Sequence, residues 1–278
     1  MLTWLYVPGD RPDRFAKAVD SGADTVILDL EDAVHPDRKA YARDAVAEFC
    51  AARHQVPVQV RINEYGSADA TADLAAVSHA PGLAALRLPK VTSPRQVARI
   101  ASEVRAGVAL YPLLESALGV ERAYDIASAH PSVAGIALGE ADLRSDLGVG
   151  DDAGLAYARG RAVLAARAAG LPAPAMSVYP DVRDLDGLAA SCRAGRALGF
   201  VGRAAIHPRQ LPVIVEAFRP SADEVRRAEE LLAALAAADA SGNGTAVLPD
   251  GRFADRAMAE QARKVVELQR GLSARQAT

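Results

Sequence analysis

The sequence predicts an α/β protein, a (β/α)8 TIM barrel followed by a C-terminal helical segment. Short runs rich in Val, Ile and Leu alternate with longer Ala-rich amphipathic runs, and this strand-then-helix unit occurs eight times. The strand-like runs are almost continuously apolar, which is typical of parallel strands buried on both faces. Eight such units are the number that closes a barrel.

Each predicted strand is short and is followed by a longer predicted helix. The predicted strands are residues 2–7, 25–30, 58–62, 85–88, 108–114, 133–138, 175–179 and 200–206. The predicted helices lie near residues 12–20, 38–53, 68–78, 94–105, 117–129, 152–169, 184–198 and 209–217. An open, doubly wound sheet is the alternative, but the GxGxxG motif expected after its first strand is absent.

The end of the chain has a different pattern from the repeated units. A Leu- and Ala-rich helix is predicted over 221–238, followed by a flexible break at 241–244 and a second helix over 255–270. A segment of this size is too small for a core of its own. We therefore expect a barrel domain over 1–220, and we expect 221–278 to dock on the barrel or on a neighbouring subunit.

Composition and charge exclude several classes of protein. The 278 residues have a formal net charge of −3 with both signs mixed, so no surface for nucleic acid is expected. No apolar stretch reaches the ~20 residues of a membrane-spanning helix, and the N-terminus lacks the basic start of a secretory signal. Cys50 and Cys192 lie outside any CxxC motif, which argues against disulfides and zinc. These features predict a cytoplasmic protein without membrane or nucleic-acid partners.

Ionisable residues follow seven of the predicted strands, and a barrel builds its active site from the C-terminal ends of its strands. These ends read Asp29-Leu30-Glu31-Asp32, Arg61-Ile62-Asn63, Pro89-Lys90, Glu115-Ser116, Gly139-Glu140-Ala141-Asp142, Tyr179-Pro180-Asp181 and Ile206-His207-Pro208. Carboxylates gathered at one place resist ionising together unless a cation is bound. Oxygen ligands favour Mg2+, which polarises carbonyl groups. The alternative is a salt-bridge network with Arg61, Lys90 and Arg144.

Three basic residues at the strand ends have two interpretations each. Arg61 suits bidentate binding of a substrate carboxylate, but it equally suits a structural ion pair with Glu31 or Asp29. His207 is expected to hold backbone at the rim rather than act as a base, because no Ser or Cys nucleophile accompanies it. Lys90 is expected to act electrostatically rather than as a Schiff base, because nearby carboxylates keep it protonated.

Seven short motifs are spread along the chain: Tyr6-Val7-Pro8-Gly9, Asp29-Leu30-Glu31-Asp32, Arg61-Ile62-Asn63, Leu88-Pro89-Lys90, Leu114-Glu115-Ser116, Gly139-Glu140-Ala141-Asp142-Leu143, and Gly199-Phe200 with Ile206-His207-Pro208. In this order they resemble the signature of the HpcH/HpaI aldolase and citrate lyase family. The chain is most similar to the stand-alone citrate lyase beta-subunit-like proteins. The similarity covers residues 2 to about 270, nearly the whole chain.

This resemblance implies a (β/α)8 barrel, a homotrimer and a Mg2+ ion held by Glu115 and Asp142. It implies that Arg61 binds the carboxylate of a 2-oxo acid. Substrates in the family are acyl-CoA thioesters such as malyl-CoA, citryl-CoA or citramalyl-CoA. The implied reaction cleaves or forms the carbon–carbon bond between the 2-oxo acid and the acyl-CoA, with Glu115 and Arg61 among the catalytic residues.

The resemblance also implies contacts with CoA and a lid. Tyr6 and Lys17 fall where related enzymes contact the CoA moiety, and His207 is a further candidate for substrate binding. Residues 251–255 resemble the family's lid motif, whose aspartate reaches into the adjacent subunit's site. Asp255 is therefore the candidate general acid/base. From its local sequence alone, Asp255 is instead a helix N-cap.

Some positions depart from the family pattern, and rival functions stay open. Ala254 stands where a larger aliphatic residue is usual, and Met176 where many relatives have a polar one. Asp32 replaces the histidine that is typical of the branch acting on free hydroxy-oxo acids, which argues against that branch. The rivals are thioester hydrolysis in the same pocket, aldol cleavage of a non-CoA hydroxy-oxo acid, and ligand binding without turnover.

Overall fold

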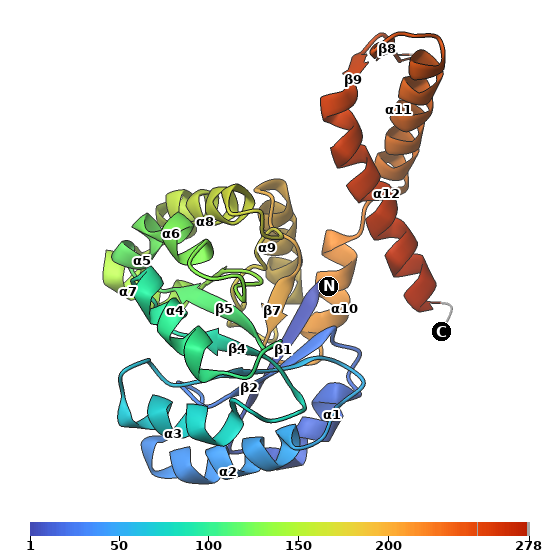
Figure 1. The fold of residues 1–278 in the computed structure, drawn as a ribbon. Coiled ribbons are helices and arrows are strands. Elements are labelled where there is room, and N and C mark those ends of the chain that lie inside the picture. Colours follow the sequence, from blue (N-terminus) through green and yellow to red (C-terminus); the bar gives the residue numbers. More distant parts are fainter. Residues whose placement is uncertain (249, 277–278) are drawn as a thin grey trace. The chain divides into compact units, whose positions relative to one another are not determined.

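The fold is known from a computed structural model, which describes residues 1–248 and 250–276. The chain separates into two compact units, Met1–Phe218 and Arg219–Thr278. The first unit is a parallel sheet with helices around it, and the second consists of long helices joined by a short hairpin (Figure 1). In the described part of the chain, no helix combines the length and apolar composition needed to cross a membrane.

In the described part of the first unit, seven strands form one sheet in the order β6-β5-β4-β3-β2-β1-β7. The strands are β1 (Thr3–Pro8), β2 (Thr25–Asp29), β3 (Val58–Arg61), β4 (Leu83–Leu88), β5 (Ala109–Leu114), β6 (Ala137–Leu138) and β7 (Arg203–Ala205). Every neighbouring pair is parallel. All five residues of β2 are buried, as expected for a strand covered on both faces. The predicted α/β class is thus confirmed.

The predicted strand over 175–179 is not a regular strand in the structure. Met176 forms a single parallel bridge with Arg203 of β7. Pro174 and Pro180, on either side of the predicted strand, have no backbone N–H to donate, so any ladder around Met176 is limited to residues 175–179. Among the described residues, the regular strands form a seven-stranded half barrel, and the complete eight-stranded barrel stays a prediction.

Side-chain packing holds the segment around Met176 where the ladder does not. Ala175 is buried in a cluster with Trp4, Ile27 and Ala204, which come from β1, β2 and β7, and Tyr6 packs against the same cluster. Burial of apolar side chains is non-directional and does not require a regular ladder. The segment therefore lies beside the strands whose ends form the candidate site.

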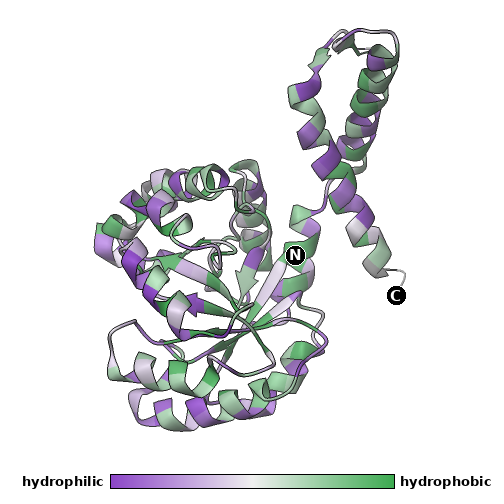
Figure 2. Cartoon of the chain, in the orientation of Figure 1, coloured by the Kyte–Doolittle hydropathy of each residue, from purple (hydrophilic) through white to green (hydrophobic). Residues whose placement is uncertain are grey.

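Helices of the first unit begin and end close to where the apolar periodicity predicts. They are α1 (Phe15–Val19), α2 (Lys39–Cys50), α3 (Ala68–Val77), α4 (Pro94–Glu103), α5 (Ala117–Glu121), α6 (Ala123–Ala127), α7 (Glu140–Leu147), α8 (Ala156–Ala168), α9 (Leu185–Ala197) and α10 (Gln210–Phe218), with 3-10 turns η1 (Pro12–Arg14), η2 (Pro36–Arg38) and η3 (Asp152–Leu155). Figure 2 shows apolar and polar segments mixed along these helices, as in amphipathic helices that cover a sheet. The sequence analysis missed α7, which starts where the end of a strand was expected.

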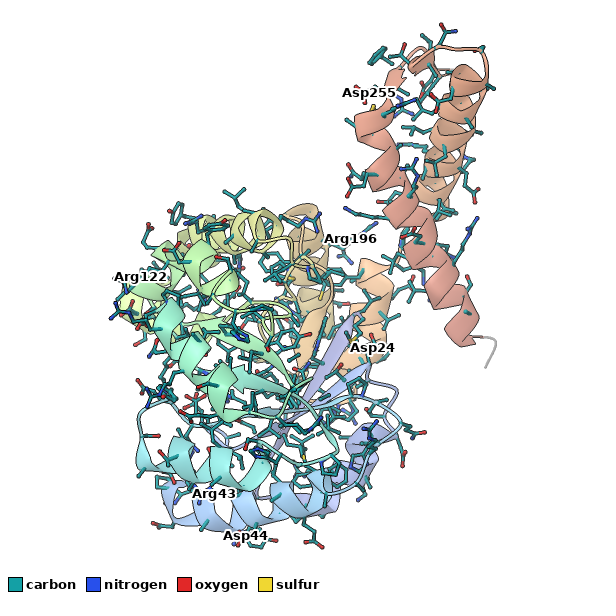
Figure 3. The ribbon with its side chains drawn as sticks, in the orientation of Figure 1. Asp24, Arg43, Asp44, Arg122, Arg196 and Asp255 are labelled. Atoms are coloured by element: carbon teal, nitrogen blue, oxygen red, sulfur yellow. The ribbon has the colours of Figure 1, made fainter. Side chains whose placement is uncertain are left out.

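An ion-pair network ties α2 and α3 to the end of β3. Arg43, which is labelled in Figure 3, donates from Nε to Asp73 and from Nη2 to Asp69, both at 2.8 Å. The side chain of Asp73 is fully buried and also accepts the backbone N–H of Asn63 at 2.9 Å and its side-chain amide at 2.7 Å. Removing one partner of such a network would leave a buried charge without compensation. The network therefore fixes the backbone directly after β3.

The second unit has a hydrophobic core of its own. It contains α11 (Ala222–Ala240), β8 (Thr245–Val247), β9 (Phe253–Asp255) and α12 (Arg256–Gln276). Its buried cluster comprises Ala228, Leu231, Leu235, Leu248, Ala254, Ala259, Ala262 and Val266. The expectation that this segment lacks a core was wrong, because the antiparallel β8–β9 hairpin folds α12 back onto α11 and each helix covers the apolar face of the other (Figure 1). Ala254, the departure from the family's lid motif, is fully buried in this cluster.

Candidate active site

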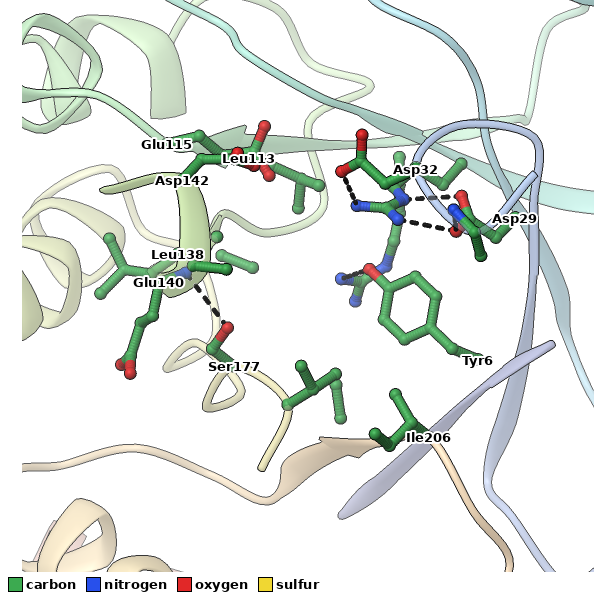
Figure 4. A pocket seen from close by; sticks show the side chains of 18 of the residues that line it. Tyr6, Asp29, Asp32, Leu113, Glu115, Leu138, Glu140, Asp142, Ser177 and Ile206 are labelled. Carbon is green, nitrogen blue, oxygen red and sulfur yellow. Dashed lines mark hydrogen bonds and ion pairs between the residues drawn. The ribbon is translucent and has the colours of Figure 1, made fainter. Parts of the chain in front are cut away.

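A cavity of about 480 Å3 opens at the carboxyl ends of the strands, and all seven strands of the sheet contribute to its lining. It brings together many of the residues that the sequence singled out. These are Tyr6, Asp29, Asp32, Arg61, Glu115, Glu140 and Asp142. Figure 4 shows the charged residues together with apolar ones such as Leu113, Leu138 and Ile206. A concave, mostly apolar pocket with a few convergent polar groups is the usual form of a small-molecule site.

Arg61, at the end of β3, forms a bidentate ion pair with Asp29, its neighbour in register on β2. Its Nε and Nη2 atoms donate to the two carboxylate oxygens, each at 2.7 Å. Burial opposes the charge of Arg61, but Asp29 outweighs this effect and the pKa of Arg61 is raised. The structural ion pair considered from the sequence is therefore present. The remaining Nη1 atom lies 3.0 Å from Oε2 of Glu31, so a substrate carboxylate at Arg61 would share Nη1 with Glu31.

Glu31 is buried between two cations. Nζ of Lys90 donates to Oε1 of Glu31 at 2.8 Å. Oε2 of Glu31 lies near Arg61 but is not aligned with it, and it has no hydrogen-bond partner among the described residues. Burial raises the pKa of Glu31 in spite of the two cations. Burial also opposes the charge of Lys90, but the hydrogen bond and charge of Glu31 raise its pKa to about 12, which matches the expected electrostatic role.

The carboxylate of Glu115, directly after β5, is held by the backbone of Lys90 and by the space at Gly139. Lys90 N–H donates to Oε2 of Glu115 at 2.7 Å. To aim this N–H, Lys90 adopts a φ of 54°, a left-handed conformation that residues other than glycine rarely take. A Cβ atom at Gly139 would lie 2.1 Å from Oε1 of Glu115, so a larger residue would displace the carboxylate. Both features position Glu115 in the cavity.

Glu115 is an unusually basic carboxyl group. Its side chain is buried, with 4% of the residue exposed. Burial raises its pKa to about 7, and the charges of Glu31 and Asp142 act in the same direction. A perturbed carboxyl group in a cavity is typical of a functional site.

Asp142 lies beside Glu115 and is presented by the first turn of α7 (Figure 4). The helix is anchored by Glu140, whose carboxylate points away from Glu115 and receives both Nε and Nη2 of Arg159 at 2.8 and 2.7 Å. The negative charge of Glu140 is thus balanced by Arg159. Asp142 has no ion-pair partner among the residues that the structure describes, so it is available for a ligand.

Glu115 and Asp142 together fit a hard divalent cation. Within residues 1–248 and 250–276, no group of three or more His, Cys, Asp or Glu side chains could hold a metal. Structural zinc sites use about four protein ligands, whereas Mg2+ is usually bound by one or two carboxylates and completes its shell with waters or substrate oxygens. A cation beside Glu115 would also offset the burial of its carboxylate. The donor set therefore suits Mg2+.

A search with protein-family models matches residues 2–208 to the HpcH/HpaI aldolase/citrate lyase family. The chain belongs to this family. The match spans most of the chain and includes all seven strand ends at the cavity, so the family resemblance inferred from short motifs is confirmed.

Relatives of this chain carry out more than one reaction. The (3S)-malyl-CoA thioesterase of Cereibacter sphaeroides is 37% identical over 90% of this chain and 88% of its own length. A citrate lyase subunit beta-like protein of Mycobacterium tuberculosis is 38% identical over 83% and 84%. The L-malyl-CoA/beta-methylmalyl-CoA lyase of Cereibacter sphaeroides is 32% identical over 97% and 95%. The family thus includes both a thioesterase and a lyase of malyl-CoA.

A solved structure resembles the whole chain. The crystal structure of protein CitE from Mycobacterium tuberculosis, in complex with magnesium, acetoacetate and coenzyme A, aligns with a TM-score of 0.80 at 33% identity. The alignment covers 96% of this chain and 97% of that chain. Magnesium is therefore a cofactor found in this family.

Lys17, His207 and Asp181 are among the residues assigned from the family motifs or strand ends that lie outside the cavity lining. Lys17 is exposed on α1, and Arg14 lines the cavity instead. His207 holds backbone at the rim, as its sequence context suggested, because its Nδ1 accepts the N–H of Arg209 at 3.1 Å. Asp181 is exposed and was wrongly placed among the clustered carboxylates, because it accepts backbone N–H groups of its own loop.

Two further residues, Arg144 and Asp255, have partners outside the cavity lining. Arg144 pairs with Asp152 on η3 and not with the carboxylates of the cavity. Asp255, at the end of β9 in the second unit, caps α12, since its Oδ1 accepts the N–H groups of Ala257 and Met258 at 3.0 and 3.2 Å (Figure 3). The helix-cap interpretation of Asp255 is thus observed, and its role as a general acid/base stays a prediction.

Arg87 is a cavity residue that the sequence analysis missed. It lies within β4, and its Nε donates to Oε1 of Gln59 at 2.9 Å while its Nη1 donates to the hydroxyl of Tyr6 at 3.4 Å. Its guanidinium also lies 5.6 Å from the ring centre of Tyr111. Site residues were expected at the ends of strands, and Arg87 precedes the end of its strand. A charged residue inside an otherwise apolar strand was the available signal.

The raised pKa of Glu115 predicts that the metal-free protein loses stability as pH rises from 4.5 to about 7. The unfolded chain releases the Glu115 proton near the ordinary value of 4.5, whereas the folded chain releases it near 7. Between these values the unfolded state binds fewer protons, so the free energy of unfolding falls with rising pH. At ~1.4 kcal/mol per pKa unit, the fall is about 3–4 kcal/mol.

Glu115→Gln should remove this part of the pH dependence, because glutamine does not ionise. The measurement is urea denaturation from pH 4.5 to 8 in the presence of a chelator. Glu48→Gln, on the exposed side of α2, is the matched control and should keep the wild-type slope. An unchanged slope in Glu115→Gln would show that Glu115 ionises normally in the folded chain.

Proposed function

We propose that this chain is a magnesium-dependent carbon–carbon lyase acting on 3-hydroxyacyl-CoA thioesters such as citryl-, malyl- or citramalyl-CoA. The products are a 2-oxo acid and an acyl-CoA, and the reaction is reversible. The observation that carries the proposal is the pair of Glu115 and Asp142, which face one cavity without an ion-pair partner among the described residues. The related structure with magnesium, acetoacetate and coenzyme A supports it.

Glu115 and Asp142 would hold the Mg2+ ion, and substrate oxygens and water would complete its coordination. When bound, Mg2+ acts as a Lewis acid that polarises the oxygen of the 2-oxo group. Nη1 of Arg61 neutralises the neighbouring carboxylate of the acid. Protonated Lys90 holds Glu31 beside Arg61, so that Glu31 does not rotate toward the substrate.

In the cleavage direction, the hydroxyl of the thioester gives its proton to the general acid/base, for which Asp255 is proposed below, and the adjacent carbon–carbon bond breaks. The hydroxyl oxygen becomes the carbonyl of the 2-oxo acid. The bonding electrons pass to the alpha carbon of the thioester as an enolate, which then takes up a proton. Apolar side chains such as Leu138, Met176 and Val178 line the cavity and exclude water from the enolate.

Asp255 is the proposed proton carrier: it accepts the hydroxyl proton and returns it to the enolate carbon, acting in the site of a neighbouring subunit of a homotrimer. In this assembly residues 1–220 form the TIM barrel and 221–278 form the lid. Oδ1 of Asp255 takes both helix-capping hydrogen bonds, so Oδ2 is left to exchange a proton. Contacts of Tyr6 and Lys17 with CoA, and a cytoplasmic location, belong to the same proposal.

Thioester hydrolysis is the second candidate function. The 37% identity to a (3S)-malyl-CoA thioesterase favours it, because that relative matches 90% of this chain. Hydrolysis would use the same cavity but direct water to the thioester carbonyl, leaving the carbon–carbon bond intact. The products therefore discriminate between the two reactions.

The first test of function measures products from malyl-, citramalyl- and citryl-CoA with Mg2+. We expect at least one thioester to yield an acyl-CoA and a 2-oxo acid in equal amounts, detected by mass spectrometry of the CoA species and a coupled dehydrogenase assay. Free CoA together with an intact hydroxy acid would establish the hydrolase instead. Cleavage of free hydroxy-oxo acids alone would indicate an aldolase, and tight binding without turnover would contradict all three activities.

Magnesium binding should depend on both carboxylates of the cavity. In calorimetry, Glu115→Gln and Asp142→Asn should each lose most Mg2+ binding, because each removes a charged ligand. Binding to the wild type should strengthen as pH rises through about 7, since Glu115 must release its proton first. Asp181→Asn, an exposed carboxylate outside the cavity, serves as the control. Wild-type affinity in both cavity variants would refute the metal assignment.

The lid proposal predicts complementation between two inactive variants. Asp255→Asn and Glu115→Gln should each be inactive alone, and a mixture should regain part of the activity. In mixed trimers some sites receive an intact Glu115 from one chain and an intact Asp255 from another. The controls are the single variants at the same total concentration. If mass spectrometry confirms subunit exchange and no activity returns, Asp255 acts only as a helix cap.

A further inference from the structure

The guanidinium of Arg87 is buried in the cavity wall without a carboxylate. The residue is 4% exposed and lines the cavity. Its contacts are neutral: the side-chain amide of Gln59, the hydroxyl of Tyr6, and the faces of the Tyr6 and Tyr111 rings. Among the described residues, no carboxylate comes within 4.0 Å of Arg87. Its Nη2 atom makes no hydrogen bond to them either.

Other buried or nearly buried arginines of the first unit are compensated within the fold. Their carboxylate partners are Asp29 for Arg61, Asp73 for Arg43 and Glu140 for Arg159. Arg203 also lacks a carboxylate, but it lies outside the cavity lining and donates to the carbonyl of Ser177 at 2.9 Å. Arg87 is thus a buried arginine that both lacks a carboxylate and borders the cavity.

A guanidinium cannot release its proton in a protein, so Arg87 stays charged. Burial of an uncompensated charge is costly, and such sites are usually compensated by a counter-ion. Gln59 and Tyr6 fix two of its nitrogens through neutral contacts, which orient the group without cancelling its charge. Arg87 is therefore a preorganised cation that lacks an anion.

Arg87 lies next to Arg61, the residue that binds a substrate carboxylate in the proposed reaction, so the anion that Arg87 lacks can come from the same substrate. Arg61 and Arg87 lie opposite each other in register on β3 and β4, which puts their backbones about 4.8 Å apart. Both guanidiniums lie over the Tyr6 ring, at 5.3 and 5.8 Å from its centre. The cavity thus holds two adjacent cations, of which Arg61 is compensated by Asp29 and Arg87 is not. A small acid with two carboxylates can engage both.

We propose that Arg87 binds the second carboxylate of a dicarboxylic 2-oxo acid of the oxaloacetate type. It thereby selects such an acid over a monocarboxylic one such as pyruvate or glyoxylate. The inference rests on the proposed function, because it assigns the substrate class of the same site. Arg87 is a specificity-determining residue in this scheme, while Glu115, Asp142 and Arg61 bind the part that all 2-oxo acids share.

The test compares freshly dissolved oxaloacetate with pyruvate, which differ by the second carboxylate, in calorimetric titrations with Mg2+ present. The wild type should bind oxaloacetate about tenfold or more tightly than pyruvate, the effect of one charge-assisted contact. Arg87→Met should lose this preference and keep its pyruvate affinity. Arg87→Lys should keep part of the preference, because lysine retains the charge but not the planar fork. Arg99→Met, an exposed arginine on α4, is the matched control.

The possible outcomes separate this inference from the proposed function. Equal affinities for the two acids in the wild type would overturn the inference alone, even if Arg87→Met failed to fold. Equal weakening of both acids by Arg87→Met would make Arg87 a general carboxylate anchor and would also overturn it. If neither acid bound in the presence of Mg2+, the proposed function would fail, and the inference with it.

Discussion

Asp29 and Arg61 join the carboxyl ends of β2 and β3 through two hydrogen bonds of 2.7 Å. The same carboxylate accepts the N–H groups of Glu31 and Ala33 at 3.0 and 3.2 Å, so it also fixes the loop after β2. That loop brings Glu31 between Arg61 and Lys90. Loss of either member of the ion pair would leave a buried charge, at a cost of about 3–5 kcal/mol. The arrangement of the other charges at the cavity depends on this pair.

Some charged residues at the cavity have an ion-pair partner within the protein, and others have none in the described part of the chain. Lys90 does two things at once: its ammonium group compensates Glu31, and its strained backbone holds Glu115 in place. Four charged groups line the cavity without an ion pair among the described residues: Glu115, Asp142, Arg87 and Arg14, of which Arg14 is exposed. In the proposed function the two carboxylates would bind a magnesium ion, and the buried guanidinium of Arg87 would bind an extra substrate carboxylate. The internal ion pairs thus stabilise the backbone around the cavity, whereas Glu115, Asp142 and Arg87 form no ion pair with any described residue and can contact a ligand.

A single cavity of this kind is compatible with both reactions found among the relatives. Binding of a thioester and polarisation of an oxygen are common to cleavage and hydrolysis. The difference lies in whether the substrate hydroxyl is deprotonated or a water molecule attacks the thioester carbonyl. Fold and family membership therefore leave the reaction open, and the site residues carry the functional proposal.

The sequence alone determined the α/β class, the family and most of the charged residues that line the cavity, because apolar periodicity and strand-end motifs are local properties of the chain. The tertiary structure decided which charges meet, since ion pairs such as Arg61–Asp29 and Glu140–Arg159 join residues far apart in sequence. It also turned Asp181 away from the cavity and placed Arg87 in its wall. Whether a charged residue forms an internal ion pair or stays available for a ligand depends on distances between side chains on different strands. A pattern in the sequence does not contain these distances.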